Sequence, residues 1–134
     1  MTAKELLDRY YEILKGKGHP GPLLSEDFLL GGTVDKETRG RDGYSDSLFF
    51  KYIQSLKVKT LIIEGERACA VVHYELASPK GDTFSCDVAE IWTLKEGKLG
   101  SLAMYFDNAA YQKFMLPMLF PLTRLKKKKQ SPLR

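Results

Sequence analysis

The sequence predicts a single α+β domain in which N-terminal helices pack on one face of a curved antiparallel sheet. Apolar residues recur at helical spacing up to about residue 57, and they alternate with a period of two from there to about residue 106. Short turns interrupt the alternating part, as in an antiparallel meander. Helices that precede such strands cover one sheet face, so a curved sheet forms a pocket between itself and the first helix.

The first helix is expected from about Thr2 to Lys15. Thr2 and Glu5 have the spacing of a capping box, in which each side chain accepts a hydrogen bond from the other residue's backbone. An apolar stripe at helical spacing follows, comprising Leu6, Leu7, Tyr10, Ile13 and Leu14. The glycine- and proline-rich segment 16–22 then ends the helix.

Two shorter helices are expected before the sheet. Residues 22–30 suit a short second helix, and the glycine-rich segment 31–37 suits a loop or a brief strand. The third helix begins near Asp42, and its apolar stripe comprises Tyr44, Leu48, Phe49, Tyr52, Ile53 and Leu56.

Four strands are expected at residues 58–64, 68–77, 83–94 and 98–106. Asp107 is a strong N-cap residue and is expected to begin a final helical turn or two. Prolines interrupt the pattern from Pro117 onward. We therefore expect a domain over residues 1–116 and an apolar, then basic, C-terminal tail over residues 117–134.

The net charge of +4 comes from this tail. Residues 124–134 hold six basic residues and no acidic one, which leaves 15 basic against 17 acidic residues, a net −2, in residues 1–123. Because the body is not basic, specific nucleic-acid binding is not expected. We expect the tail to be a docked apolar segment and a solvated charge run. The alternatives are weak contact with an anionic membrane and nonspecific contact with nucleic acid.

Cys69 and Cys86 are expected to be reduced thiols, because disulfide scaffolds occur in secreted chains with denser cysteine. Neither they nor His19 and His73 have metal-ligand spacing, so no metal and no cofactor is expected. The first helix is acidic and unlike a signal peptide, and no apolar stretch approaches the roughly 20 residues of a membrane span. These features predict a cytoplasmic protein.

Glu90 is the one acid on an otherwise apolar strand face, between Val88 and Trp92. Acids are seldom fully buried, so it faces a wet groove, pairs with a basic residue such as Arg9, or has a chemical role. His73 points to the opposite sheet face. It is expected at the surface or in an interface, with Asp87 as a possible partner across the strands.

The order of these elements resembles that of the nuclear transport factor 2-like superfamily. Within it, the chain looks most like the ketosteroid isomerase and SnoaL-like branch. The resemblance covers residues 1 to about 115 and rests on the Arg9-Tyr10 pair, on the glycine stop after the first helix and on the last hairpin, which ends in GKLGSLAMYFD. It implies a cone-shaped, cystatin-like α+β fold.

The resemblance also implies a set of site residues. In the isomerases a helix tyrosine and a protonated carboxylic acid hold a developing enolate oxygen. The matching positions here are Tyr10 and Glu90, with glutamate in place of the family's aspartate. The family's base lies between the second and third helices, where Asp35 is the first choice and Glu37 the second. The expected pocket lining is Val72, Tyr74, Val88, Trp92, Leu102, Met104 and Phe106.

The function implied is that of a pocket for a small apolar ligand, steroid- or polyketide-like, with proton transfer next to a carbonyl as an isomerase or SnoaL-like cyclase would perform it. The superfamily also implies a homodimer formed through the second sheet face. The alternative is a noncatalytic ligand-binding or dimerisation domain, because one fold hosts many functions. Tyr10 is then a core tyrosine and Asp35 a turn former.

Overall fold

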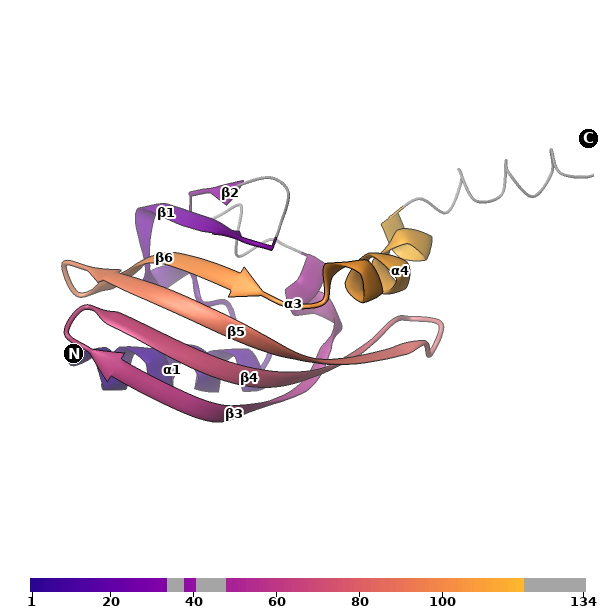
Figure 1. Cartoon of the computed structure of the whole chain (residues 1–134), viewed down its shortest axis with the longest axis horizontal. Helices are drawn as coiled ribbons and strands as arrows, with labels where there is room; N and C mark the ends of the chain where they lie inside the picture. Colours follow the sequence, from indigo (N-terminus) through magenta and orange to yellow (C-terminus); the bar gives the residue numbers. More distant parts are fainter. Residues whose placement is uncertain (34–37, 41–47, 120–134) are drawn as a thin grey trace, which may run out of the picture.

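A computed structural model describes residues 1–33, 38–40 and 48–119 of the chain. Six strands form one sheet in the order β2-β1-β6-β5-β4-β3. Helix α1 (Ala3–Lys15) lies across one face of this sheet, which we call the inner face (Figure 1). The core forms between α1 and the inner face, so the predicted α+β fold class is confirmed.

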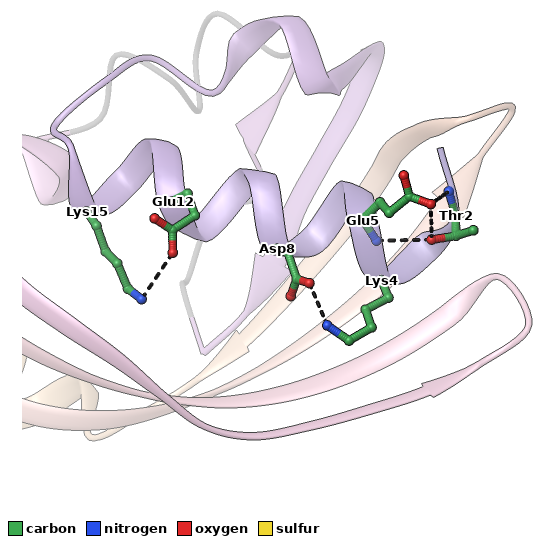
Figure 2. Close-up of polar contacts among 6 residues, drawn as sticks. All are labelled: Thr2, Lys4, Glu5, Asp8, Glu12 and Lys15. Carbon is green, nitrogen blue, oxygen red and sulfur yellow. Dashed lines mark hydrogen bonds and ion pairs between the residues drawn. The ribbon is translucent and has the colours of Figure 1, made fainter.

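Helix α1 begins with the predicted capping box. The backbone N–H of Glu5 donates to Oγ1 of Thr2 at 3.1 Å, and the Glu5 carboxylate accepts from the backbone N–H of Thr2 (Figure 2). Such a cap is worth about 1 kcal/mol. The polar side of α1 carries two exposed ion pairs, Lys4–Asp8 and Lys15–Glu12 (Figure 2). Five residues on the opposite side of the helix are buried: Leu6, Leu7, Tyr10, Tyr11 and Leu14.

The predicted second helix is wrong. Only Gly21–Leu23 is helical, as a single 3₁₀ turn, and strand β1 (Leu24–Gly32) follows it. β1 pairs in parallel with β6 and antiparallel with β2 (Thr38–Arg39). The buried leucines and phenylalanine of β1 have a spacing that fits a helix as well as a strand. In the strand, an irregularity between Leu24 and Leu29 shifts the pairing register with β6.

The third helix ends earlier than predicted. Helix α3 spans Leu48–Tyr52, and strand β3 (Ile53–Glu64) follows at once. Its predicted start near Asp42 lies outside the described residues. Ile53 and Leu56 are buried strand residues, although their spacing looked helical. A register shift between Ile53 and Ser55 lets both side chains reach the core.

The rest of the sheet is the predicted antiparallel meander. β3 is followed by β4 (Arg67–Ala77), β5 (Thr83–Lys95) and β6 (Lys98–Tyr105). Burial alternates along β4. The β5–β6 turn has positive φ at both Glu96 (51°) and Gly97 (76°), which suits the twist of a two-residue hairpin.

Helix α4 (Asn108–Leu119) closes the described part of the chain. The backbone N–H of Ala110 donates to Oδ1 of Asp107 at 3.1 Å, so the predicted cap is confirmed. The helix runs further than the one or two turns expected and includes Pro117. Among the described residues, no helix is long and apolar enough to span a bilayer. The basic run of the tail lies outside these residues.

Candidate functional site

Glu90 lies at the centre of the inner face with none of its surface exposed. It pairs with Ala70 on β4 and with Met104 on β6. Next to it, Trp92 pairs with Ala68. The two alanines leave space beside the large side chains, so Glu90 and Trp92 both fit under α1.

Two tyrosines hold the Glu90 carboxyl group. The Tyr11 hydroxyl, from α1, donates to Oε1 at 2.5 Å, and the Tyr74 hydroxyl, from β4, donates to Oε2 at 2.6 Å. Trp92 Nε1 donates in turn to the Tyr11 hydroxyl at 3.1 Å. Each carboxyl oxygen therefore has its own donor, and Tyr11 links the tryptophan to the acid. We call these four residues the Glu90 cluster.

Burial raises the pKa of Glu90 to about 7, and the hydrogen bonds from Tyr11 and Tyr74 act against this rise. Among the described residues no basic side chain forms an ion pair with Glu90, so the pairing with Arg9 is not found. A carboxyl that titrates near neutral pH can donate or accept a hydrogen bond. The cluster can therefore stabilise an oxyanion or exchange a proton.

The tyrosine hydroxyl on Glu90 belongs to Tyr11, where the resemblance had indicated Tyr10. Tyr10 is also buried, and its ring packs edge-on against Trp92, with ring centroids 4.7 Å apart. Tyr11 follows Leu7 by four residues and precedes Leu14 by three, so helical spacing already placed it on the buried side. The helical spacing could therefore have identified Tyr11 as a site residue.

The predicted pocket residues share the inner face and pack around the cluster. Val72, Val88, Leu102 and Met104 are buried together with Tyr74 and Trp92. Tyr74, expected only as lining, is the second donor to Glu90. Phe106 is half-buried and lies against Tyr111 of α4, with centroids 5.3 Å apart. The candidate bases Asp35 and Glu37 lie outside the described residues.

The outer face carries a separate polar network around His73. Its Nδ1 lies 2.8 Å from Oδ1 of Asp87 and its Nε2 lies 2.7 Å from Oε2 of Glu75, so the expected contact with Asp87 is confirmed. Lys59 pairs with Asp87 at 2.9 Å. Hydrogen bonds to Asp87 and Glu75 raise the pKa of His73. These side chains are about half exposed and lie on the sheet face opposite the Glu90 cluster.

Both cysteines are free and half-buried. Burial raises the pKa of Cys86 to about 11, so its thiol stays protonated and unreactive at neutral pH. Within the described part of the chain, no group of three or more His, Cys, Asp or Glu side chains could hold a metal ion.

Comparison with solved structures identifies the fold. An NTF2-like (nuclear transport factor 2-like) protein from Burkholderia thailandensis matches with a TM-score of 0.73 at 16% identity, covering 86% of this chain and 98% of that one. The chain has the nuclear transport factor 2-like fold. An NTF2-like protein of unknown function from Cytophaga hutchinsonii matches with a TM-score of 0.67 at 20% identity, over 81% of this chain and 93% of that one.

Two other structures with this fold carry more specific names. One, from Jannaschia sp. CCS1, is described as a SnoaL-like polyketide cyclase; it has a TM-score of 0.69 at 13% identity and covers 81% of this chain and 88% of that one. The other is TerC co-crystallised with polyporic acid, with a TM-score of 0.68 at 17% identity over 82% and 95% of the two chains. No family model and no curated protein matches the sequence.

Proposed function

We propose that the protein binds a small apolar ligand on the inner side of its sheet, with the Glu90 cluster as the polar anchor. The observation that carries this proposal is a fully buried carboxyl that is held by two tyrosines and has no basic partner among the described residues. Burying such a group costs stability, and strongly shifted carboxyl groups gather at functional sites. The ligand class is a steroid- or polyketide-like ring with a carbonyl oxygen. Its polyketide-like form is supported by two structural neighbours, TerC with polyporic acid and the SnoaL-like polyketide cyclase.

The cluster suggests how a ligand oxygen would be held. Both carboxyl oxygens already have donors, so a ligand carbonyl competes for the hydroxyl of Tyr11 or Tyr74. Glu90, protonated below pH about 7, supplies a further O–H donor. Two such donors in an apolar site stabilise the negative charge that develops on an enolate oxygen.

The catalytic form of the proposal is proton transfer next to that carbonyl, as in a ketosteroid isomerase or a SnoaL-like cyclase. Tyr11 and Glu90 would stabilise the oxyanion, and Asp35 would be the base. The alternative is a noncatalytic ligand-binding domain. The hydrogen bonds from Tyr11 and Tyr74 to Glu90 favour that alternative, since each carboxyl oxygen has a donor without a ligand.

We also propose that the outer face forms a homodimer. Ile62, Cys69, Ile91 and Ala103 form one row across four paired strands, and Tyr105 lies beside this row. Ile62 is 63% exposed, Ile91 40% and Tyr105 51%. We call these five residues the outer apolar band. An apolar band of this kind on a sheet face is typical of a surface that associates.

A phenol titration tests the ligand site. A naphthol is added at a pH below its own pKa, and the absorbance of its phenolate is followed. We expect the phenolate band to grow in the wild-type protein and to be lost in Tyr11→Phe and Glu90→Gln. Binding without ionisation would support the noncatalytic alternative. Ionisation that survives both Tyr11→Phe and Glu90→Gln would rule out the cluster as the anchor.

A further inference from the structure

A cavity of about 240 Å³ lies at the end of the sheet beside α4. Three segments line it: α3 contributes Tyr52, the β4–β5 turn contributes residues 78–80 and 82, and α4 contributes Phe114 and Pro117. Figure 1 shows this turn at the end of the sheet opposite the β3–β4 and β5–β6 turns. We call this cavity the turn cavity.

The turn cavity is separate from the Glu90 cluster. None of its lining residues belongs to the cluster. Glu90 lies seven positions along β5 from Thr83, where the strand begins. At the usual rise of a strand, this separation is about 20 Å.

Phe114 and the backbone of the β4–β5 turn, two parts of the cavity wall, are held in place. Phe114 stacks on Phe84 with ring centroids 5.6 Å apart, and Phe84 also lies against Tyr111. In the turn, the backbone N–H of Ser78 donates to the Asp82 carbonyl at 2.8 Å, and the Asp82 N–H donates back to Oγ of Ser78 at 3.1 Å. Ordering these parts of the wall therefore adds little to the entropy cost of binding a ligand.

Two opposite charges at this cavity remain separate. Lys80 and Asp82 both line it, and they do not form an ion pair with each other or with another described residue. Elsewhere on the surface lysines do reach carboxylates, as Lys95 does with Asp27 at 2.7 Å. The hydroxyl of Tyr52 likewise has no hydrogen-bond partner among the described residues. The turn cavity thus combines apolar rings with one cation and one anion that are available to a ligand.

We propose that the turn cavity binds a small zwitterion with an aromatic side chain, of the chemical class of a free aromatic amino acid. The ring lies between Tyr52 and Phe114, the carboxylate pairs with Lys80, and the ammonium pairs with Asp82. A cavity of about 150 Å³ accepts benzene, so about 240 Å³ holds one ring with a short polar arm. This site is independent of the function proposed for the Glu90 cluster.

Amide chemical shifts of the full-length chain test the proposal, with L-phenylalanine as the probe and two half-charged analogues, phenylacetate and phenethylamine. We expect L-phenylalanine to shift the amides of residues 78–82 and of Phe114, with a Kd on the order of 1 mM, typical of a ligand this small. Each analogue loses one charge contact and should bind about fivefold more weakly. No shift at residues 78–82, or equal affinity for the three ligands, would overturn the proposal.

Two charge variants assign the contacts. Lys80→Gln should weaken L-phenylalanine and phenylacetate about fivefold and leave phenethylamine unchanged, whereas Asp82→Asn should weaken L-phenylalanine and phenethylamine and leave phenylacetate unchanged. Both side chains are exposed, so both variants should fold. Lys113→Gln, on the exposed surface of α4 and outside the cavity lining, is the matched control. Weakening of all three ligands by either variant, or by the control, would contradict the assignment.

Discussion

At the scale of single residues, the chemistry of this protein depends on how Glu90 is desolvated. Water is excluded from its carboxyl, and two neutral hydroxyl donors replace it instead of a cation. Neutral donors stabilise a carboxylate less than water and a positive charge would, so the proton is held to a higher pH. The acid is therefore poised between its two forms at physiological pH.

The raised pKa of Glu90 makes the free energy of unfolding depend on pH. The folded pKa of Glu90, about 7, lies above its ordinary value of 4.5. Between these values the folded state holds a proton that the unfolded state has lost, so the free energy of unfolding falls as pH rises from 4.5 to 7. The Glu90 contribution to that fall is roughly 3 kcal/mol.

Urea denaturation of the wild type and of Glu90→Gln at pH 5 and pH 8 measures this contribution. Other titrating groups, such as His73, are common to both proteins, so their effects cancel in the difference. We expect wild type to lose stability relative to Glu90→Gln on going from pH 5 to pH 8. A difference between the two proteins that does not change with pH would contradict the raised pKa.

The two tyrosines should differ in what their removal costs. Within the Glu90 cluster, Tyr11→Phe removes two hydrogen bonds, the one to Oε1 of Glu90 and the one from Nε1 of Trp92, whereas Tyr74→Phe removes one, the hydrogen bond to Oε2. We expect a loss of about 3 kcal/mol for Tyr11→Phe and about 2 kcal/mol for Tyr74→Phe, because a buried polar group left unpaired is costly. Chemical denaturation at fixed pH measures both. The opposite order would show that Trp92 finds another acceptor.

Glu90 could be identified from the sequence because it is the one acid on a strand face whose other residues, at every second position, are apolar. Its partners could not be assigned with the same certainty. Tyr10 and Tyr11 are adjacent on a helix whose buried side is wide enough to include both, so the packing of α1 on the sheet decides which hydroxyl meets the acid. Alternation placed Tyr74 on the correct face but carried no information about how far its side chain reaches.

At the scale of elements, β1 is the longest segment that the hydrophobic pattern assigned wrongly, as a helix in place of a strand. Its apolar residues fit a helix, and the information against a helix lies in the two glycines that end the strand. Gly32 has φ +98° and lies so close to β6 that a Cβ would come within 2.2 Å of the Met104 carbonyl oxygen. Only glycine fits this backbone and this approach. The pairing partner is more than 70 residues away in sequence, so local reasoning cannot anticipate it.

Gly32→Ala should therefore destabilise the protein by more than about 3 kcal/mol, because the strand pair has to separate to admit the methyl group. The neighbouring Gly31 is the matched control, since nothing lies within 4 Å of a Cβ placed there. Gly31→Ala should change the free energy of unfolding by less than about 1 kcal/mol. Thermal or urea unfolding distinguishes the two, and similar stabilities would show that β1 and β6 do not approach as described.

At the scale of the whole molecule, the two faces of the sheet differ in what they carry. The described helices pack against the inner face, where the Glu90 cluster lies, and α1 is behind the sheet in the view of Figure 1. The outer face carries the outer apolar band and, further along the same strands, the network around His73. The two proposed functions, association and ligand binding, therefore lie on opposite faces, and substitutions should separate them.

Ile91→Lys tests this separation. Ile91 lies mid-row in the outer apolar band and is already 40% exposed, so a lysine there should leave the fold intact and place an unpaired charge in the centre of the proposed dimer interface. We expect sedimentation to show a dimer for wild type and a monomer for Ile91→Lys, with ionisation of the bound naphthol unchanged.

Leu116→Lys, at an exposed leucine of α4, is the control and should remain dimeric. A monomeric wild type, or dissociation by Leu116→Lys as well, would assign the band another role. Loss of naphthol ionisation in Ile91→Lys would mean that the ligand site depends on dimerisation, and the two faces would then be coupled through β5.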